Sequence, residues 1–228
     1  MSQPTPPAHN PRSIQLDDLS PVVQDYLKAI WTATEWGAAP ITTTGLAQRF
    51  NTSKATVSEA MRRLSHAGLI NYRPYHPVTL TATGATHATA MVRRHRLIET
   101  FLAKVLNYPW TQVHTEAERL EHAVSDTFID RIDAYLEHPK HDPHGDPIPP
   151  MPTITNATQL SATTTGEHHI LRVSDANPTT LNTLATLGLT PGTQLKIIRH
   201  TTKTIKLQNS TGTHVVSTEL AAAIWLLN

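Results

Sequence analysis

The sequence predicts a mainly α-helical protein that ends in a small all-β domain. Apolar residues recur at helical spacing over most of residues 20–136, whereas short β-type runs separated by turns fill residues 167–228. The turn-forming run HDPHGDPIPP at 141–150 separates the two patterns. With 228 residues and 39% hydrophobic residues, the chain is expected to form several small cores and one to three domains.

The N-terminal third predicts three helices and a two-stranded wing. The first helix begins at Pro21 with Ser20 as its cap and runs to about residue 35. A second helix is expected at 45–50 and a third at 54–67, where Gly68 ends it. Short strands at 69–73 and 78–80 flank a proline-bounded turn. This order is typical of a winged helix-turn-helix.

The remaining elements are three helices and a set of short strands. A long helix is expected from 81 or 82 to 106, followed by helices at about 110–123 and 126–136. Residues 138–165 are rich in turn formers and read as loop and linker. The expected strands are 170–173, 194–199, 204–208 and 214–217, with a short helix at 179–186. About five short strands within some 60 residues are typical of a small β-barrel.

One predicted helix carries four metal-capable side chains, His114, Glu118, Glu121 and His122. Their offsets of i, i+4, i+7 and i+8 place them on one helical face. The preceding helix carries a second i, i+4 pair, His95 and Glu99. A single such pair is more often a solvated face with weak ion pairs. The combination on two successive helices, in a chain without cysteine, predicts a metal site built from imidazole and carboxylate.

Composition excludes several classes of protein. The absence of cysteine excludes disulfide scaffolds and thiolate zinc sites. No apolar run approaches the roughly 18 residues of a membrane helix, and the polar N-terminus has no signal-peptide core, so we expect a cytoplasmic protein with no membrane contact. No His-Glu-x-x-His motif or glycine-rich phosphate loop is present, so neither an enzyme nor a small-molecule substrate is expected. A modest basic bias lies at residues 20–80, within a net charge of +1.

The winged helix, the C-terminal barrel and several short motifs together resemble the diphtheria-toxin-repressor family of metal-dependent transcription repressors, over about residues 20–228. The motifs are RRHRLIE at 93–99, VHTEAERLEH at 113–122, SD at 125–126 and HGDPIP at 144–149. The resemblance implies a homodimer that binds double-stranded operator DNA. It also implies a winged helix-turn-helix domain (19–80), a helical metal-binding and dimerisation domain (81–152), a linker (153–166) and an SH3-like β-barrel domain (167–228). The polar, proline-rich N-terminus predicts a disordered tail (1–18) before them.

The resemblance implies a primary metal site formed by Asp25, Glu118, Glu121 and His122. Iron-sensing members have Cys at the position of Glu118 and Met at that of Asp25. Both are carboxylates here, as in the manganese-responsive branch, and hard Mn²⁺ suits oxygen and imidazole ligands. We therefore expect Mn²⁺ as the cofactor, with Fe²⁺ and Zn²⁺ as alternatives. The first helix, which carries Asp25 next to the helix-turn-helix, is the expected switch.

A second site, and so up to two ions per subunit, is implied by His95, Glu99 and His114. In three-domain members the barrel adds oxygen ligands, for which Asp175 and Asn177 are the nearest candidates. Some two-domain manganese members carry a second carboxylate where this chain has Lys28, which favours the separated sites of the three-domain form. His141 and His144 are flanked by prolines and are interpreted as ordinary loop residues.

The recognition helix is expected to expose short polar and charged side chains to DNA. These are Ser53, Lys54, Thr56, Ser58, Glu59 and Arg62, with Arg73 in the wing as a phosphate contact. Such a face suits shape readout more than direct base readout. Two other interpretations stay open: a helix-turn-helix used for protein interaction, and a metallohydrolase with a DNA-binding appendage. The apolar run from Ile98 to Leu106 is interpreted as core or dimer interface.

Overall fold

The computed structural model describes residues 15–152 and 156–227, and the chain divides into two compact units. One unit contains Met1–Trp31 and Pro40–Ala88, and the other contains Thr32–Ala39 and Thr89–Asn228. Within the described residues, no helix combines the length and apolar character needed to cross a bilayer.

The first unit is a winged helix-turn-helix. Its helices are α1 (Pro21–Thr32), α2 (Thr43–Arg49) and α3 (Lys54–His66), and its wing is an antiparallel pair of two-residue strands, β1 (Ile70–Asn71) and β2 (Thr79–Leu80). Caps define the helix starts, since Thr42 accepts the Gly45 N–H and Ser53 accepts the Thr56 N–H. The core contains Val57, Met61 and Leu64 of α3, which lie at helical spacing on one face.

The helical part of the second unit contains α4 (Ala82–Lys104), of which residues 89–104 belong to this unit, α5 (Val113–Leu120) and α6 (Asp126–Tyr135). Apolar residues of α4, α5 and α6 share one core with Ile148 from the loop that follows. The α5 helix is shorter than predicted. Glu121 is its C-cap and His122 lies in the next turn, so the predicted single helical stripe ends at Glu118.

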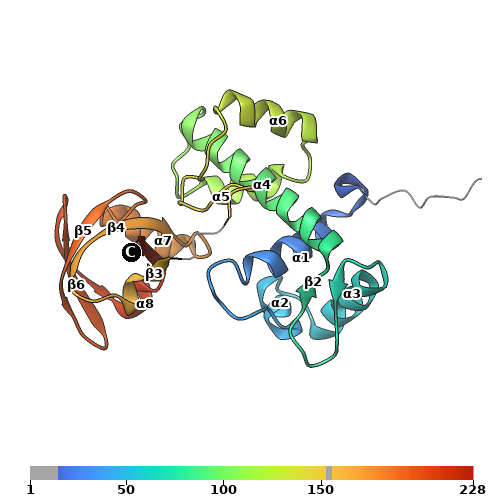
Figure 1. The fold of residues 1–228 in the computed structure, drawn as a ribbon, viewed down its shortest axis with the longest axis horizontal. Coiled ribbons are helices and arrows are strands. Elements are labelled where there is room, and N and C mark those ends of the chain that lie inside the picture. The colour runs from blue at the N-terminus through green and yellow to red at the C-terminus, as the bar shows by residue number, and fades with distance from the viewer. Residues whose placement is uncertain (1–14, 153–155, 228) are drawn as a thin grey trace, which may run out of the picture. The chain divides into compact units, whose positions relative to one another are not determined.

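The C-terminal barrel is a six-stranded antiparallel sheet, orange to red in Figure 1, with the order β3-β8-β4-β5-β6-β7. The strands are β3 (Ala157–Gln159), β4 (Gly166–Val173), β5 (Gln194–His200), β6 (Thr204–Asn209), β7 (Gly212–Ser217) and β8 (Ile224–Leu227). Helices α7 (Pro178–Thr186) and α8 (Thr218–Ala221) lie between strands. Alternate strand residues such as Leu195 and Ile197 point into one apolar core.

Three sequence predictions need correction. Leu16–Asp18 form a 3-10 helix with Leu16 buried, so the predicted disorder to residue 18 is wrong for these residues; residues 1–14 lie outside the described part. The predicted linker 153–166 is wrong from residue 157, because β3 and the 3-10 helix Leu160–Ala162 fall within it, while 153–155 lie outside the described residues. The last strand of the described residues, β8, was not among the predicted strands.

Candidate metal centre

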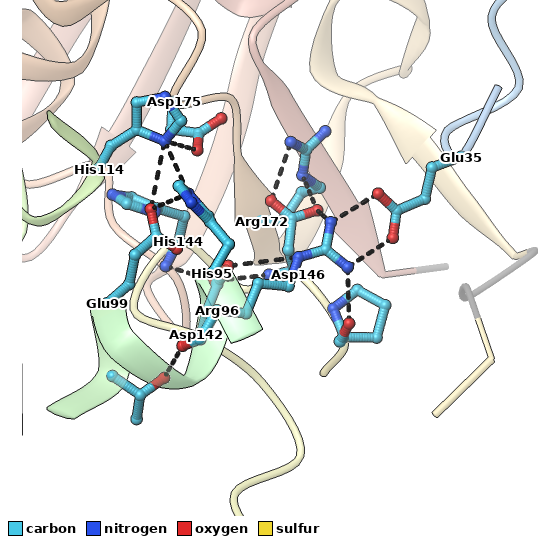
Figure 2. Close-up of polar contacts among 12 residues, drawn as sticks. Glu35, His95, Arg96, Glu99, His114, Asp142, His144, Asp146, Arg172 and Asp175 are labelled. Carbon is cyan, nitrogen blue, oxygen red and sulfur yellow. Dashed lines mark hydrogen bonds and ion pairs between the residues drawn. The ribbon is translucent and has the colours of Figure 1, made fainter. Parts of the chain in front are cut away.

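Four side chains from three segments of the second unit converge on one point. His95 and Glu99 come from α4, His114 comes from α5, and Asp175 follows β4 of the barrel, and one ligand atom of each lies within 4.8 Å of the others. His95 Nε2 is 3.0 Å from Glu99 Oε1, and His114 Nδ1 is 3.2 Å from that oxygen and 2.8 Å from Asp175 Oδ2 (Figure 2). The i, i+4 spacing on α4 therefore does point both donors at a common partner.

The charges at this point depend on one another. Burial alone would raise the pKa of Glu99, but the charge of His95 and the neighbouring imidazoles of His114 and His144 hold it well below its usual range. Burial would likewise lower the pKa of His114, yet hydrogen bonds to Asp175 and Glu99 outweigh this effect and raise it to about 11. Protonated imidazoles thus neutralise the buried carboxylates, a role that a bound cation could also fill.

His144 and Asp142 add further ligand atoms next to Glu99. Neither residue was predicted from the sequence to belong to a metal site. Glu99, Asp142 and His144 are all buried and form a second group of ligand atoms within 4.8 Å. His144 Nε2 donates to the Trp110 carbonyl oxygen at 2.8 Å, and its Nδ1 lies 3.8 Å from Glu99 Oε1. Neither His144 Nδ1 nor Glu99 Oε2 makes a hydrogen bond. Buried polar atoms without partners are rare and fit the donor set of a cation.

The loop that carries Asp142 and His144 is held in place by its own backbone. Asp142 Oδ1 accepts the N–H groups of His144 (2.8 Å) and Asp146 (2.9 Å). Between them Gly145 has φ +91, and a Cβ there would lie 2.1 Å from the Leu171 carbonyl oxygen of β4. Glycine is therefore required for this close approach. His144 was interpreted from the sequence as an ordinary loop residue, but these contacts fix the loop so that His144 lies at the metal centre.

The surroundings of Asp142 disfavour the ionised form of its carboxyl group. Burial raises its pKa well above the ordinary value, and the neighbouring carboxylates of Asp146 and Glu99 raise it further. The pKa of His144 is raised to about 10, because the nearby carboxylates of Glu99 and Asp142 outweigh the effect of burial. A divalent cation among these oxygens would relieve the carboxylate repulsion that raises the pKa of Asp142, and would replace the proton that the carboxylates hold on His144.

Asn177 does not join this group. Its Oδ1 accepts the N–H groups of Thr179 (2.9 Å) and Thr180 (3.1 Å) and thereby caps α7. Both lone pairs of this oxygen are thus used in the fold. The barrel supplies Asp175 to the centre, and we assign Asn177 a capping role instead of a ligand role.

The residues predicted for the primary site lie in both units. Glu118, Glu121 and His122 belong to the second unit, where Glu121 is buried, its Oε1 is 3.4 Å from His122 Nε2 and its Oε2 is 2.5 Å from His95 Nδ1. Glu118 is more exposed, with its Oε1 3.9 Å from His95 Nδ1. Asp25 lies on α1 in the first unit, and the four-residue site stays a prediction.

The predicted DNA-contacting residues lie on α3 and the wing of the first unit. Ser53, Lys54, Thr56, Glu59, Arg62 and Arg73 are exposed and Ser58 is half-buried. The Ser53 hydroxyl caps α3, and Arg62 forms an i, i+3 ion pair with Glu59. Local contacts therefore order this face, while Lys54 and Arg73 extend cationic side chains from it.

Three family models match the chain in sequence. Residues 18–78 match the N-terminal DNA-binding domain of iron-dependent repressors, residues 81–150 match their metal-binding and dimerisation domain, and residues 158–227 match the FeoA domain. The matched segments follow the order of the winged helix-turn-helix, the helical region and the barrel.

Curated relatives include the iron-dependent repressor IdeR of Mycobacterium leprae, 33% identical over 147 residues, which are 64% of each chain. The diphtheria toxin repressor of Corynebacterium diphtheriae is 34% identical over 134 residues, 59% of each chain. These alignments thus span about three fifths of the curated relatives. A solved manganese-dependent transcriptional repressor in complex with manganese is similar over 90% of this chain and 99% of its own, with 42% identity and a TM-score of 0.85. The manganese regulator SloR has 31% identity and a TM-score of 0.76, over 91% and 99%.

Proposed function

Because the chain belongs to the family of iron-dependent repressors that includes the diphtheria toxin repressor, we propose that it is a manganese-dependent, DNA-binding transcriptional repressor that controls metal-uptake genes. The matched models describe DNA-binding, metal-binding and dimerisation domains, so the family is one of repressors and not of enzymes. The operator is its proposed partner, with a homodimer in the cytoplasm as the active form.

The donor set of the candidate metal centre carries this proposal. Around Glu99 it consists of carboxylate oxygens and imidazole nitrogens, and the chain has no cysteine to add a thiolate. Mn²⁺ is a hard ion that is well matched by such ligands, whereas thiolate and thioether favour softer ions. The predicted primary site, with Asp25, Glu118, Glu121 and His122, has the same ligand types. When bound, Mn²⁺ would supply positive charge between carboxylates that otherwise repel one another.

The proposed regulation is a change in order of the DNA-binding unit. Asp25 on α1 would hold this helix to Glu118, Glu121 and His122 when Mn²⁺ is present. Binding would then fix the spacing of two recognition helices, each α3, against the two half-sites of an operator. Since linkage is reciprocal, operator DNA is expected to raise Mn²⁺ affinity by the same factor by which Mn²⁺ raises DNA affinity.

The decisive experiment is fluorescence anisotropy of labelled promoter DNA, taken upstream of the protein's own gene or of a manganese-transporter gene. The full chain is titrated at fixed salt with Mn²⁺, Fe²⁺ and Zn²⁺, because DNA affinity is salt-dependent. Tight binding with micromolar Mn²⁺ and not with Fe²⁺ supports the proposal. Equal activation by Fe²⁺ would favour the second candidate, an iron-responsive repressor, which the curated relatives suggest. Metal-independent DNA binding would contradict both.

A further inference from the structure

The segment Thr32–Ala39, which we call the connector, links α1 to α2 but belongs to the second unit. The chain passes between the two units after Trp31, after Ala39 and after Ala88, so two of these three passages flank the connector. Contacts that fix the connector therefore restrain the chain at two points, where it leaves the first unit after Trp31 and where it re-enters at Pro40.

A buried ion pair fixes the connector to α4. Arg96 Nη1 donates to Glu35 Oε1 at 2.8 Å and Arg96 Nη2 donates to Glu35 Oε2 at 2.6 Å, and these two side chains are 7% and 2% exposed. The same Arg96 Nη1 donates to the Pro147 carbonyl oxygen at 2.7 Å (Figure 2). Paired guanidinium bonds of this kind are strong and directional, so Glu35 is held both to the helix and to the 142–148 loop.

A second contact fixes the connector to the barrel. The Arg172 guanidinium of β4 lies 4.6 Å from the ring centroid of Trp36 and 4.4 Å from that of Trp225 on β8. Arg172 Nη2 donates to Asp146 Oδ2 at 3.0 Å, and Arg172 Nε forms an ion pair with Asp146 Oδ1 at 2.9 Å. Trp36 Nε1 donates to Asp146 Oδ1 at 2.7 Å. Cation–π contact and a shared acceptor thus hold the Trp36 indole in one position.

The residues that hold the connector, Glu35, Trp36, Arg96, Asp146 and Arg172, are here called the clamp. Three of the four segments that supply the candidate metal centre, all except α5, also supply a residue to this clamp. On α4, His95 of the centre is followed by Arg96; in the loop, His144 stands two residues before Asp146; at the end of β4, Arg172 stands three residues before Asp175. A shift of any of the three segments at the centre is therefore transmitted to a side chain that contacts the connector.

Electrostatic interactions also link the clamp to the Glu99–Asp142–His144 group. The clamp sets two guanidinium groups, Arg96 and Arg172, against the carboxylates of Glu35, Asp142 and Asp146, with Arg96 Nε 3.7 Å from Asp142 Oδ2. Asp142 is also one of the ligand atoms grouped with Glu99 and His144. A cation bound there would draw on the same carboxylate that Arg96 now faces, so the two clusters cannot respond independently.

From this arrangement we propose that Glu35, Trp36, Arg96, Asp146 and Arg172 are positioning residues that transmit occupation of the Glu99–Asp142–His144 group to the connector, and through it to the DNA-binding unit. The last step rests on the proposed repressor function, whereas the ordering of the connector does not. In this proposal the barrel positions the connector through Arg172, in addition to supplying Asp175 to the metal centre.

The first test measures the connector directly. Hydrogen–deuterium exchange of residues 32–39 is compared in the full chain with chelator and with saturating Mn²⁺. Slower exchange with Mn²⁺ in the wild type, and loss of that difference in Arg172→Gln, is expected. Equal exchange in the two wild-type samples would overturn the proposal. Arg199→Gln on β5, an exposed arginine of the same barrel, is the matched control and should behave as wild type.

The second test measures transmission to DNA. Mn²⁺ affinity is determined by calorimetry, and the ratio of DNA dissociation constants without and with Mn²⁺ is determined by anisotropy. Arg172→Gln and Glu35→Gln should lower this ratio by about fivefold or more, a typical size for coupling between sites, with Mn²⁺ affinity kept within about threefold. Arg172→Lys, which keeps the charge, should restore part of it. An unchanged ratio in both Gln variants would overturn the transmission step.

Failures of the two proposals are distinguishable. If wild-type DNA binding does not respond to Mn²⁺, the repressor function fails, and the exchange experiment still decides whether the metal orders the connector. Because Arg172→Gln removes a buried contact, circular dichroism melting establishes that it is folded. Trp36→Phe, which keeps a ring and loses the indole N–H, gives an independent variant that should also lose the Mn²⁺-dependent protection of the connector.

Discussion

The imidazole of His95 touches Glu121 with one nitrogen and the Glu99 centre with the other. Its Nδ1 is 2.5 Å from Glu121 Oε2 and its Nε2 is 3.0 Å from Glu99 Oε1. Glu121 belongs to the predicted primary site and Glu99 to the second. The His95 ring therefore links the two predicted sites, and a change at either one reaches the other through the two hydrogen bonds of this ring.

Replacing Glu121 with Ala is expected to weaken both sites. It removes a primary ligand, and it also removes the acceptor that orients His95 for the second site. Loss of such an orienting partner typically costs about 10–100-fold in metal affinity. Calorimetric titration with Mn²⁺ measures the effect. Glu118→Ala is the control, because Glu118 Oε1 is 3.9 Å from His95 Nδ1, too far for a hydrogen bond. Identical second-site affinities in the two variants would contradict the prediction.

Glu118→Ala is in turn expected to abolish Mn²⁺-dependent operator binding while leaving the dimer folded. The reason is that the Glu118 side chain is 40% exposed, so its truncation leaves no large cavity, whereas a primary site with three ligands would bind Mn²⁺ poorly. Anisotropy and size-exclusion chromatography measure the two properties. A metal response like that of the wild type would refute the primary-site assignment.

Metal selectivity is expected to follow residues 25 and 118. The double variant Asp25→Met, Glu118→Cys replaces two hard oxygen ligands with softer sulfur ligands, which should shift activation of DNA binding from Mn²⁺ towards Fe²⁺. The concentration of each ion that gives half-maximal anisotropy under anaerobic conditions measures the shift. Unchanged selectivity would show that these positions do not set the response.

Mn²⁺ binding is expected to strengthen as pH rises. In the metal-free protein the pKa of His114 is about 11 and that of His144 about 10, against an ordinary value of 6.5, so both rings are protonated at pH 7. A ring nitrogen must lose its proton before it binds metal. Affinity should therefore increase between pH 6 and 8 by about tenfold per unit for each proton released. Calorimetry in buffers of different ionisation enthalpy counts those protons, and a count of zero would contradict the prediction.

The stability of the metal-free protein should change with pH in the opposite direction. Raised folded-state pKa values stabilise the fold fully below about pH 6.5, and this contribution is lost as the pH rises through about 10 to 11. Urea denaturation in chelator should therefore give a lower free energy of unfolding at pH 9 than at pH 6. Saturating Mn²⁺ should reduce that difference, because the bound ion replaces the protons.

Asp175 and Asn177 are expected to separate binding from folding. Asp175→Asn removes a charged donor from the centre and should lower second-site Mn²⁺ affinity. Asn177→Ala removes the cap of α7, which typically costs about 1 kcal/mol of stability, and should leave that affinity unchanged. Calorimetry and thermal melting of both variants measure the two effects. A loss of Mn²⁺ affinity in Asn177→Ala would return this residue to the site.

Part of the candidate site could be predicted because it depends on short-range geometry. His95 and Glu99 lie one helical turn apart, so their convergence follows from α-helical spacing. The caps and apolar stripe of α3 are equally local. Residues 120–122 show the limit of such reasoning, since α5 ends at Leu120 and Glu121 meets His95 through the tertiary fold instead of through a continuous stripe.

The sequence by itself determined the order of the three regions, the winged helix-turn-helix and the metal-capable pairs on α4 and α5, because helix periodicity, caps and turn residues act over a few positions. Only the tertiary structure decided that His144 joins Glu99, that Asp175 and not Asn177 faces His114, and that Glu35 pairs with Arg96. β3 and β8 likewise pair with each other across more than 60 residues. These contacts join segments distant in the chain, and burial makes them strong, whereas no local pattern encodes which distant residues will share a buried site.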